Sequence, residues 1–185
     1  MKYFNNFINM VLFVGLVAVV VAAENKFIPS NNKNLAVVYT FDKENDAAFN
    51  SFIETDLKKI GFFLNDPHKR VNDVYEKNFG STSLETIGFS PILNESVVRP
   101  LLTKDPRLGG FSPFNLVQYR KKSDKKTVIT HLTAEAILDI LEIDDNEIRE
   151  KYISSFVPLD NLIEEKLGGE KSYLPLVGLT NDRMM

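Results

Sequence analysis

The segment FNLVQYRKKSDKKTVITHL (residues 114–132) decides the fold, because it joins two β-rich stretches through a polar, charged turn. Residues 114–120 and 127–132 contain mainly β-branched, aromatic and aliphatic side chains, which favour strands. Ser123 and Asp124 lie between two groups of cations and are typical of a turn. The segment therefore predicts an antiparallel β-hairpin.

Upstream of the hairpin, residues 35–41 (LAVVYTF) are almost entirely apolar, which predicts a strand buried on both faces and central in its sheet. We expect Asp42 to cap the helix that follows, and Gly61 stands where the C-cap of that helix belongs. The apolar stripe of this helix recurs at steps of three and four residues and consists of Phe49, Phe52, Ile53, Leu57 and Ile60.

Three shorter elements fill the chain before the hairpin. Residues 62–64 predict a second strand, and residues 71–79 predict a short helix that ends at Gly80. Residues 84–89 predict a third strand, which we expect Ser90 and Pro91 to break. A helix capped by Ser96 should follow, with a late start or a bend at Pro100. We expect this helix to end at Asp105-Pro106, because the residue before a proline is pushed out of the helical region.

Helices dominate the region after the hairpin. Thr133 is placed to cap one helix, and a second begins near Asp144-Asp145. We expect Pro158 to stop or kink the second helix, after which residues 159–167 form a last amphipathic piece closed by Gly168-Gly169. The tail from Glu170 shows no pattern. Together the elements predict an α+β domain: a mainly antiparallel sheet of about five strands, with helices on one face and C-terminal helices.

The N-terminus has the features of an export leader. Lys2 lies in a short polar region, 14 apolar or glycine residues follow from Met10 to Ala23, and small residues precede Glu24. We therefore predict a signal peptide over residues 1–23, a linker over 24–33, a domain over 34–167 and a tail over 168–185. The alternative is a retained anchor, which the run is too short to favour, because a span needs about 20 residues. This organisation predicts a periplasmic or secreted protein that meets the membrane only through its leader.

Composition excludes several chemistries. The chain has no cysteine, so thiolate metal sites, thiol nucleophiles and disulfides are absent. The net charge of −3 argues against nucleic acid as a partner. Five cations lie within residues 120–126, and we interpret them as the solvated tip of the hairpin, with a site for an anionic partner as the alternative.

Reactive groups are sparse. His68 and His131 are the only histidines, so a metal site would need both of them together with a carboxylate such as Asp66, Asp73 or Glu135. No nucleophile elbow of the form Gly-x-Ser-x-Gly is present. The sequence therefore favours a protein that is not an enzyme and needs no cofactor or metal.

One stretch resembles a known family. Residues 101–114 (LLTKDPRLGGFSPF) combine a short helix that ends at Asp-Pro, a loop and an apolar-Pro step ahead of the hairpin, and this order is similar to the bacterial domain of unknown function 302. The resemblance implies a small α+β domain, often exported, with a curved sheet like that of the TATA-binding protein and dimers in some members. Residues 88–91 (GFSP) depart from the family's Phe-Gly-Asn-Pro corner, because the asparagine is missing.

These observations predict a non-catalytic exported module that binds a small ligand or a protein partner through its concave sheet or the loop 109–114. The candidate surface consists of Phe111, Pro113, Phe114, Tyr119 and His131. Two alternatives stay open: a metal- or haem-assisted redox accessory protein that uses His68 or His131, and a structural homodimer subunit that associates through Phe111 and Phe114.

Overall fold

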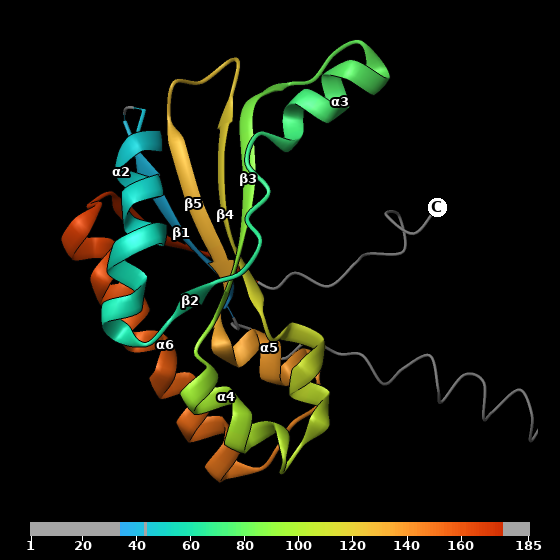
Figure 1. Ribbon diagram of the computed structural model, residues 1–185, viewed down its shortest axis with the longest axis vertical. Coiled ribbons are helices and arrows are strands. Elements are labelled where there is room, and N and C mark those ends of the chain that lie inside the picture. Colours follow the sequence, from blue (N-terminus) through green and yellow to red (C-terminus); the bar gives the residue numbers. More distant parts are fainter. Residues whose placement is uncertain (1–33, 43, 176–185) are drawn as a thin grey trace, which may run out of the picture. The chain divides into compact units, whose positions relative to one another are not determined.

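A six-stranded sheet of order β2-β3-β4-β5-β1-β6, in which every pair of neighbours is antiparallel, forms the centre of the fold (Figure 1). The computed structural model describes residues 34–42 and 44–175, which form one unit. The predicted leader and linker lie outside these residues, as does the end of the tail. The predicted α+β class is confirmed, with six strands in place of about five.

The predicted hairpin forms as expected. Strands β4 (Phe114–Lys121) and β5 (Thr127–Leu132) pair from Val117 opposite Thr130 to Arg120 opposite Thr127. Alternate residues of β4 point to opposite faces of the sheet, so Leu116, Gln118 and Arg120 are buried while their neighbours are half-buried or exposed. The hairpin therefore has one covered face and one more open face.

Strand β1 (Asn34–Phe41) pairs with β5 on one side and with β6 (Glu170–Pro175) on the other. β1 is therefore an inner strand, as expected, but the expectation that both of its faces are buried is wrong, because Val38 and Thr40 on one face are only half-buried. Strand β6 was not predicted, and it extends the sheet beyond the predicted end of the domain at residue 167.

The helix after β1 begins at Asp46 and not at Asp42. Its parts are α2 (Asp46–Ser51), a π-helical segment η1 (Phe52–Asp56) and a 3-10 segment η2 (Leu57–Ile60). Asn45 precedes the helix, and Gly61 ends it in the left-handed region at φ 80°. The predicted apolar stripe is confirmed, since four of its five members are fully buried and Ile60 packs against them.

Strand β3 (Leu84–Leu93) continues through Ser90 and Pro91, so the predicted break is wrong. The Pro91 carbonyl accepts a hydrogen bond from the Asn65 N–H at 2.8 Å, on the side of β3 away from β4. The missing N–H of Pro91 therefore faces this side too and removes no bond to β4. Strand β2 (Phe63–Leu64) covers only the last residues of β3.

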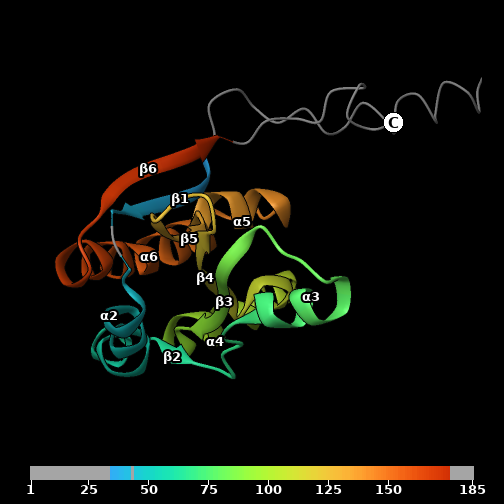
Figure 2. The ribbon, with the colours of Figure 1, turned by 90° about the horizontal axis from the view of Figure 1, so that it is seen from above.

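Helix α3 (Val71–Phe79) forms where predicted and ends at Gly80, but its apolar residues do not enter the core. Val74, Tyr75 and Phe79 are 57, 49 and 73 % exposed. The helix lies beside β3, and both Figure 1 and Figure 2 show β3 between α2 and α3.

Helix α4 (Glu95–Leu102) starts one residue before the predicted cap Ser96 and contains Pro100, and a 3-10 turn η3 (Pro106–Phe111) follows Asp105. The side chain of Thr133 caps α5 (Ala134–Ile140), accepting a hydrogen bond from the Ala136 N–H at 3.1 Å. Asp145 caps α6 (Asn146–Lys166) by accepting a hydrogen bond from the Ile148 N–H at 2.9 Å. Thr133 was predicted as a cap, and the second helix was predicted to begin near Asp144-Asp145.

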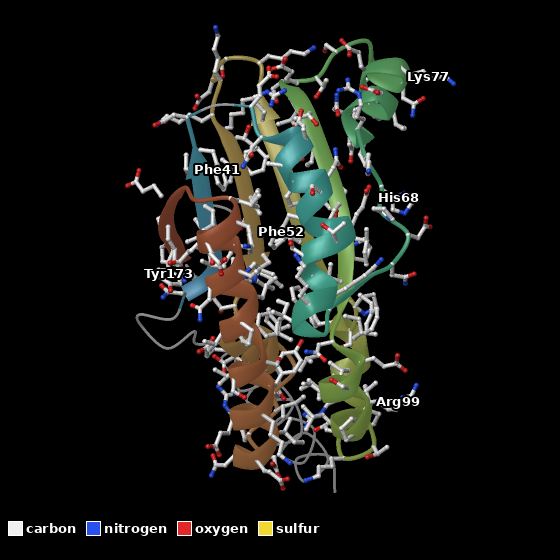
Figure 3. All side chains as sticks on the ribbon, turned by 60° about the vertical axis from the view of Figure 1, so that its left-hand side comes forward. Phe41, Phe52, His68, Lys77, Arg99 and Tyr173 are labelled. Atoms are coloured by element: carbon white, nitrogen blue, oxygen red, sulfur yellow. The ribbon has the colours of Figure 1, made fainter. Side chains whose placement is uncertain are left out.

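Helix α6 runs without interruption past Pro158, so the predicted stop is wrong. A proline removes one intrahelical bond, but Phe156, Leu159 and Ile163 bury apolar surface on both sides of it and hold the helix on the core. Helices α2 and α6 lie on the same face of the sheet (Figure 3), which confirms the predicted layer. In the described part of the chain, no helix is both long and apolar enough to cross a bilayer.

Candidate functional site

A cleft lies between α2 and strands β3 and β4, on the helix-covered face of the sheet. Its volume is about 190 Å³, and it is lined by Asp46, Phe49, Asn50, Ile53, Lys69, Arg70, Thr86, Gly88, Ser90 and Gln118. Phe49 and Ile53 anchor the helix, but the residues of β3 beneath it are small: Thr86, Gly88 and Ser90 alternate along the strand. Side chains of this size leave the space under α2 unfilled.

Gly88 forms part of the floor of this cleft. Its backbone is not in the left-handed region, so no strain requires a glycine here. A Cβ atom at this position would lie 3.5 Å from the His68 carbonyl oxygen and 3.8 Å from Lys69 Cα, which are ordinary contacts. Neither strain nor a clash therefore requires a glycine at this position.

Three polar residues of the floor are nearly inaccessible from outside. Thr86, Ser90 and Gln118 are 7, 3 and 8 % exposed. Gln118 Nε2 donates to Asp46 Oδ1 at 2.9 Å, which leaves its carbonyl Oε1 available. Among the described residues, no hydrogen bond engages Gln118 Oε1 or the hydroxyls of Thr86 and Ser90. These oxygens are not among the fully buried side-chain atoms that lack a partner, so they are accessible from the cleft and available to a polar molecule there.

Asp46, which lines the cleft, lies beside a buried guanidinium. Arg120 Nε donates to Glu85 Oε2 at 3.0 Å, and its Nη2 lies 3.5 Å from Asp46 Oδ2 and 3.6 Å from Glu44 Oε1. Burial opposes the charged form, but the hydrogen bond to Glu85 and the neighbouring carboxylates raise the pKa of Arg120 above its usual value. The guanidinium is fixed and permanently charged, and it holds Asp46 at the mouth of the cleft.

Two exposed ion pairs also lie at the cleft, and the charge of Arg70 interacts with Asp46 and Glu85 as well. Lys69 Nζ lies 3.1 Å from Glu54 Oε1 on the π-helical segment. Arg70 binds Asp73 through two hydrogen bonds of 2.9 and 2.8 Å, and this guanidinium lowers the pKa of the Asp73 carboxyl. Arg70 adopts a left-handed backbone with φ 57°. Non-glycine residues with positive φ and π-helical segments are both found preferentially at functional sites.

The five predicted surface residues do not meet at one surface. Phe114 and His131 are buried and contact each other, with ring centroids 5.9 Å apart, and Phe156 stacks on Phe114 at 4.6 Å. Phe111 packs partly against the core, and exposed Pro113 follows a cis peptide bond. Tyr119 lies on the opposite, more open face of β4. Binding by any of them stays a prediction.

The two histidines lie on different segments and do not meet. His68 forms a bridge to Phe89 at the edge of β3, and Figure 3 shows it at the outside of the molecule. His131 Nε2 lies 3.0 Å from Asp160 Oδ1, and its Nδ1 lies 2.8 Å from the Leu132 carbonyl oxygen. In residues 34–42 and 44–175, no group of three or more histidine and carboxylate side chains is arranged to hold a metal ion.

Asp160 connects His131 to the edge strand. Lys171 of β6 lies 3.5 Å from Asp160 Oδ2 and 2.7 Å from Glu164. Burial works to raise the pKa of Asp160, but the hydrogen bond from His131 and the charge of Lys171 outweigh it and lower the pKa below its usual value. Through these side-chain contacts, α6 binds both β5 and β6.

The sequence contains a signal for the cleft that the sequence analysis did not use. In residues 84–90 (LETIGFS), Ile87 and Phe89 alternate with Thr86, Gly88 and Ser90, so one face of the strand is apolar and the other is small and polar. A small, polar face directed toward a helix is unusual for a core strand. It marks a cleft only once the position of α2 is known.

The fold and the cleft together define a small α+β domain with a polar pocket beneath a helix. No family model and no curated protein matches the chain. Among solved structures, it is similar to the crystal structure of the uncharacterized conserved protein DUF302 from Bacillus stearothermophilus. The two are 18 % identical with a TM-score of 0.58, over 70 % of this chain and 97 % of that chain. The predicted resemblance to domain of unknown function 302 is thereby confirmed for the fold.

Proposed function

We propose that this protein is an exported, non-catalytic module that binds a small polar molecule in the cleft between α2 and β3. The observation that supports the proposal best is the combination of a cleft of about 190 Å³ with available oxygen atoms on Thr86, Ser90 and Gln118 that have no hydrogen bond among the described residues. A volume of about 190 Å³ suits a ligand of few heavy atoms.

The hydroxyls of the cleft lack the neighbours of a catalytic nucleophile. Activation of a serine or threonine needs a base within hydrogen-bond distance and a group that orients that base. Among the described residues, neither Thr86 nor Ser90 has a hydrogen bond to a histidine or a carboxylate, and no histidine lines the cleft. This arrangement supports binding over catalysis.

The two alternatives from the sequence lack a comparable observation. Both ring nitrogens of His131 already face oxygen atoms, so a metal ion or haem would have to displace Asp160 or the Leu132 carbonyl. A dimer through Phe111 and Phe114 would need Phe114 at the surface, but its ring stacks on Phe156 in the core.

A blocking variant tests the binding site. The full chain is titrated with a library of small polar compounds while its backbone amide NMR spectrum is followed. Compounds that bind should shift the resonances of Gly88 and of the Gln118 side-chain amide, and Gly88→Leu should abolish those shifts by filling the cleft. Ala48→Leu, which adds similar bulk on the exposed side of α2, is the matched control and should bind normally.

Two results would count against the site: binding that survives Gly88→Leu unchanged, or a broad library that shifts no resonance of the cleft. The exported location has a separate test. When the full chain is produced in a Gram-negative host, the protein recovered from the periplasm should begin at Glu24. Recovery from the cytosol with Met1 retained would contradict export and leave the binding proposal intact.

A further inference from the structure

We infer that residues 65–70, which we call the strap, are the gate through which a ligand enters the cleft, an inference that rests on the function proposed above. The strap joins β2 to α3 and runs along the outer edge of β3 (Figure 1). Lys69 and Arg70 of the strap line the cleft. A Cβ atom at Gly88 would lie 3.5 Å from the His68 carbonyl oxygen, so the backbone of the strap passes directly beside the floor.

A ligand larger than water needs one wall of the cleft to move. The floor residues Thr86, Ser90 and Gln118 are at most 8 % exposed, so such a ligand does not reach them from outside without a change in the walls. The floor itself is held in the sheet, because β3 pairs with β4 along most of its length. The wall formed by α2 and η1 is fixed too, since Phe49 and Ile53 are buried in the core. The strap is the wall that remains.

The strap is attached mainly through its backbone. None of its six residues is buried. The Asn65 N–H donates to the Pro91 carbonyl oxygen at 2.8 Å, and further along the strap His68 exchanges two backbone hydrogen bonds with Phe89, at 2.8 and 2.9 Å. Segments with few buried apolar contacts and exposed backbone hydrogen bonds open locally at a small cost in free energy. The strap can therefore open while the sheet stays folded.

One side-chain contact holds the strap against the wall on the other side of the cleft. Lys69 Nζ lies 3.1 Å from Glu54 Oε1, which belongs to η1. Both side chains are about half exposed, so water and salt weaken this ion pair. Arg70 instead binds Asp73 and fastens the end of the strap to α3. The Lys69–Glu54 pair is therefore the contact that must break when the strap opens.

Hydrogen exchange of neighbouring amides in β3 tests the gate without a ligand. Hydrogen-bonded pairs alternate along antiparallel strands, so the N–H groups of Gly88 and Ser90 point toward β4, whereas that of Phe89 donates to the strap. In the full chain, the Phe89 and His68 amides should be at least about tenfold less protected than those of Gly88 and Ser90. Glu54→Gln, outside the lining, should speed exchange at Phe89 and His68 about two- to fivefold and leave Gly88 and Ser90 unchanged.

A thiol placed in the floor tests access directly. The chain has no cysteine, so Ser90→Cys carries a single thiol, and its reaction with iodoacetamide reports the entry of a small neutral molecule. It should react at least about tenfold more slowly than Ser154→Cys, at an exposed position of α6. Adding Glu54→Gln should raise its rate about two- to fivefold. Glu147→Gln, which breaks an exposed ion pair of α6, is the matched control and should change neither measurement.

The outcomes separate the gate from the function on which it rests. Equal protection of Phe89 and its neighbours Gly88 and Ser90 would show that the strap opens only when β3 unfolds, which overturns the inference. Reaction of Ser90→Cys as fast as Ser154→Cys would show that the cleft is open without movement of the strap, which overturns it as well. So would rates that Glu54→Gln leaves unchanged. If Ser90→Cys does not fold, the amide measurement decides. In every case the library titration tests binding in the cleft separately.

Discussion

Asn72 uses its side chain to pair with the main chain of Glu85, as a neighbouring strand would do. Its Nδ2 donates to the Glu85 carbonyl oxygen at 2.9 Å, and its Oδ1 accepts from the Ile87 N–H at 3.1 Å. Further along the same edge, His68 exchanges two backbone hydrogen bonds with Phe89. Because β2 covers only the end of β3, these contacts close an edge that would otherwise be open to other chains.

Replacing Asn72 should weaken the contact between α3 and the edge of β3. Asn72→Ala removes both hydrogen bonds and leaves backbone groups of β3 without partners, so we expect the free energy of unfolding to fall by about 1–3 kcal/mol. Urea denaturation measures this change. Exchange of the Ile87 amide hydrogen should also become faster, because its acceptor is lost.

Lys77→Ala is the matched control on the same helix, since this exposed side chain has no hydrogen bond among the described residues. It should change stability by less than about 0.5 kcal/mol. Equal effects of the two substitutions would show that α3 is not fastened to β3 through Asn72.

Asp160 should contribute stability that depends on pH. Its pKa in the folded protein is lowered, so the stabilisation is complete above the ordinary carboxyl value and is lost as pH falls below about 4 toward the lowered value. Asp160→Asn should reduce the free energy of unfolding by about 1–3 kcal/mol at neutral pH. The difference in free energy of unfolding between Asp160→Asn and the parent protein should decrease as pH falls through this range.

Glu164→Gln provides the comparison for Asp160, because Glu164 also contacts Lys171 but its side chain is about half exposed. We expect a change of less than about 1 kcal/mol for this surface pair. Urea denaturation at a series of pH values distinguishes the two variants. A loss in Asp160→Asn that stays constant from pH 7 to pH 2 would contradict the role of its charge.

The aromatic cluster around Phe156 should dominate the packing of α6. Phe156 contacts the rings of Phe114, His131 and Tyr152 at centroid distances of 4.6, 5.8 and 5.2 Å. Phe156→Ala should therefore reduce the free energy of unfolding by about 3–5 kcal/mol. Val157→Ala, at the exposed neighbouring position, should change it by less than about 0.5 kcal/mol. A small loss in Phe156→Ala would mean that the cluster is loosely packed.

The elements predicted correctly depend on neighbours in the sequence. The hairpin of residues 114–132 follows from β-rich segments joined by a short turn, and the caps Thr133 and Asp145 each bind an N–H three residues later. Such contacts join residues that are close in the sequence, so a short segment is enough to predict them. The helices that begin at these caps were therefore predictable.

The elements that were missed depend on contacts between distant segments. Strand β6 has little apolar periodicity, and it forms because its backbone pairs with β1, over 120 residues earlier. Pro158 was expected to stop or kink a helix, but α6 continues past it, and the apolar residues on both sides of it pack on the core. The cleft follows the same rule, since the small residues of β3 enclose a space only when α2 lies above them.

The turn into β6 depends on two adjacent glycines with different surroundings. Gly168 and Gly169 both have positive φ, 74° and 97°, so alanine at either position should cost about 1 kcal/mol in backbone strain. A Cβ atom at Gly168 meets nothing within 4 Å, whereas one at Gly169 would lie 2.7 Å from Cε1 of Phe41. The Phe41 ring is buried and cannot move aside freely.

We therefore expect Gly169→Ala to reduce the free energy of unfolding by about 1–3 kcal/mol more than Gly168→Ala, because overpacking adds to the strain. Urea denaturation of both variants measures the difference. Truncating the obstructing ring, in the double variant Phe41→Leu with Gly169→Ala, should recover part of the additional loss relative to the sum of the single changes. Equal losses in the two glycine variants, or strictly additive losses in the double variant, would mean that β6 reaches β1 without the close approach of Gly169 to Phe41.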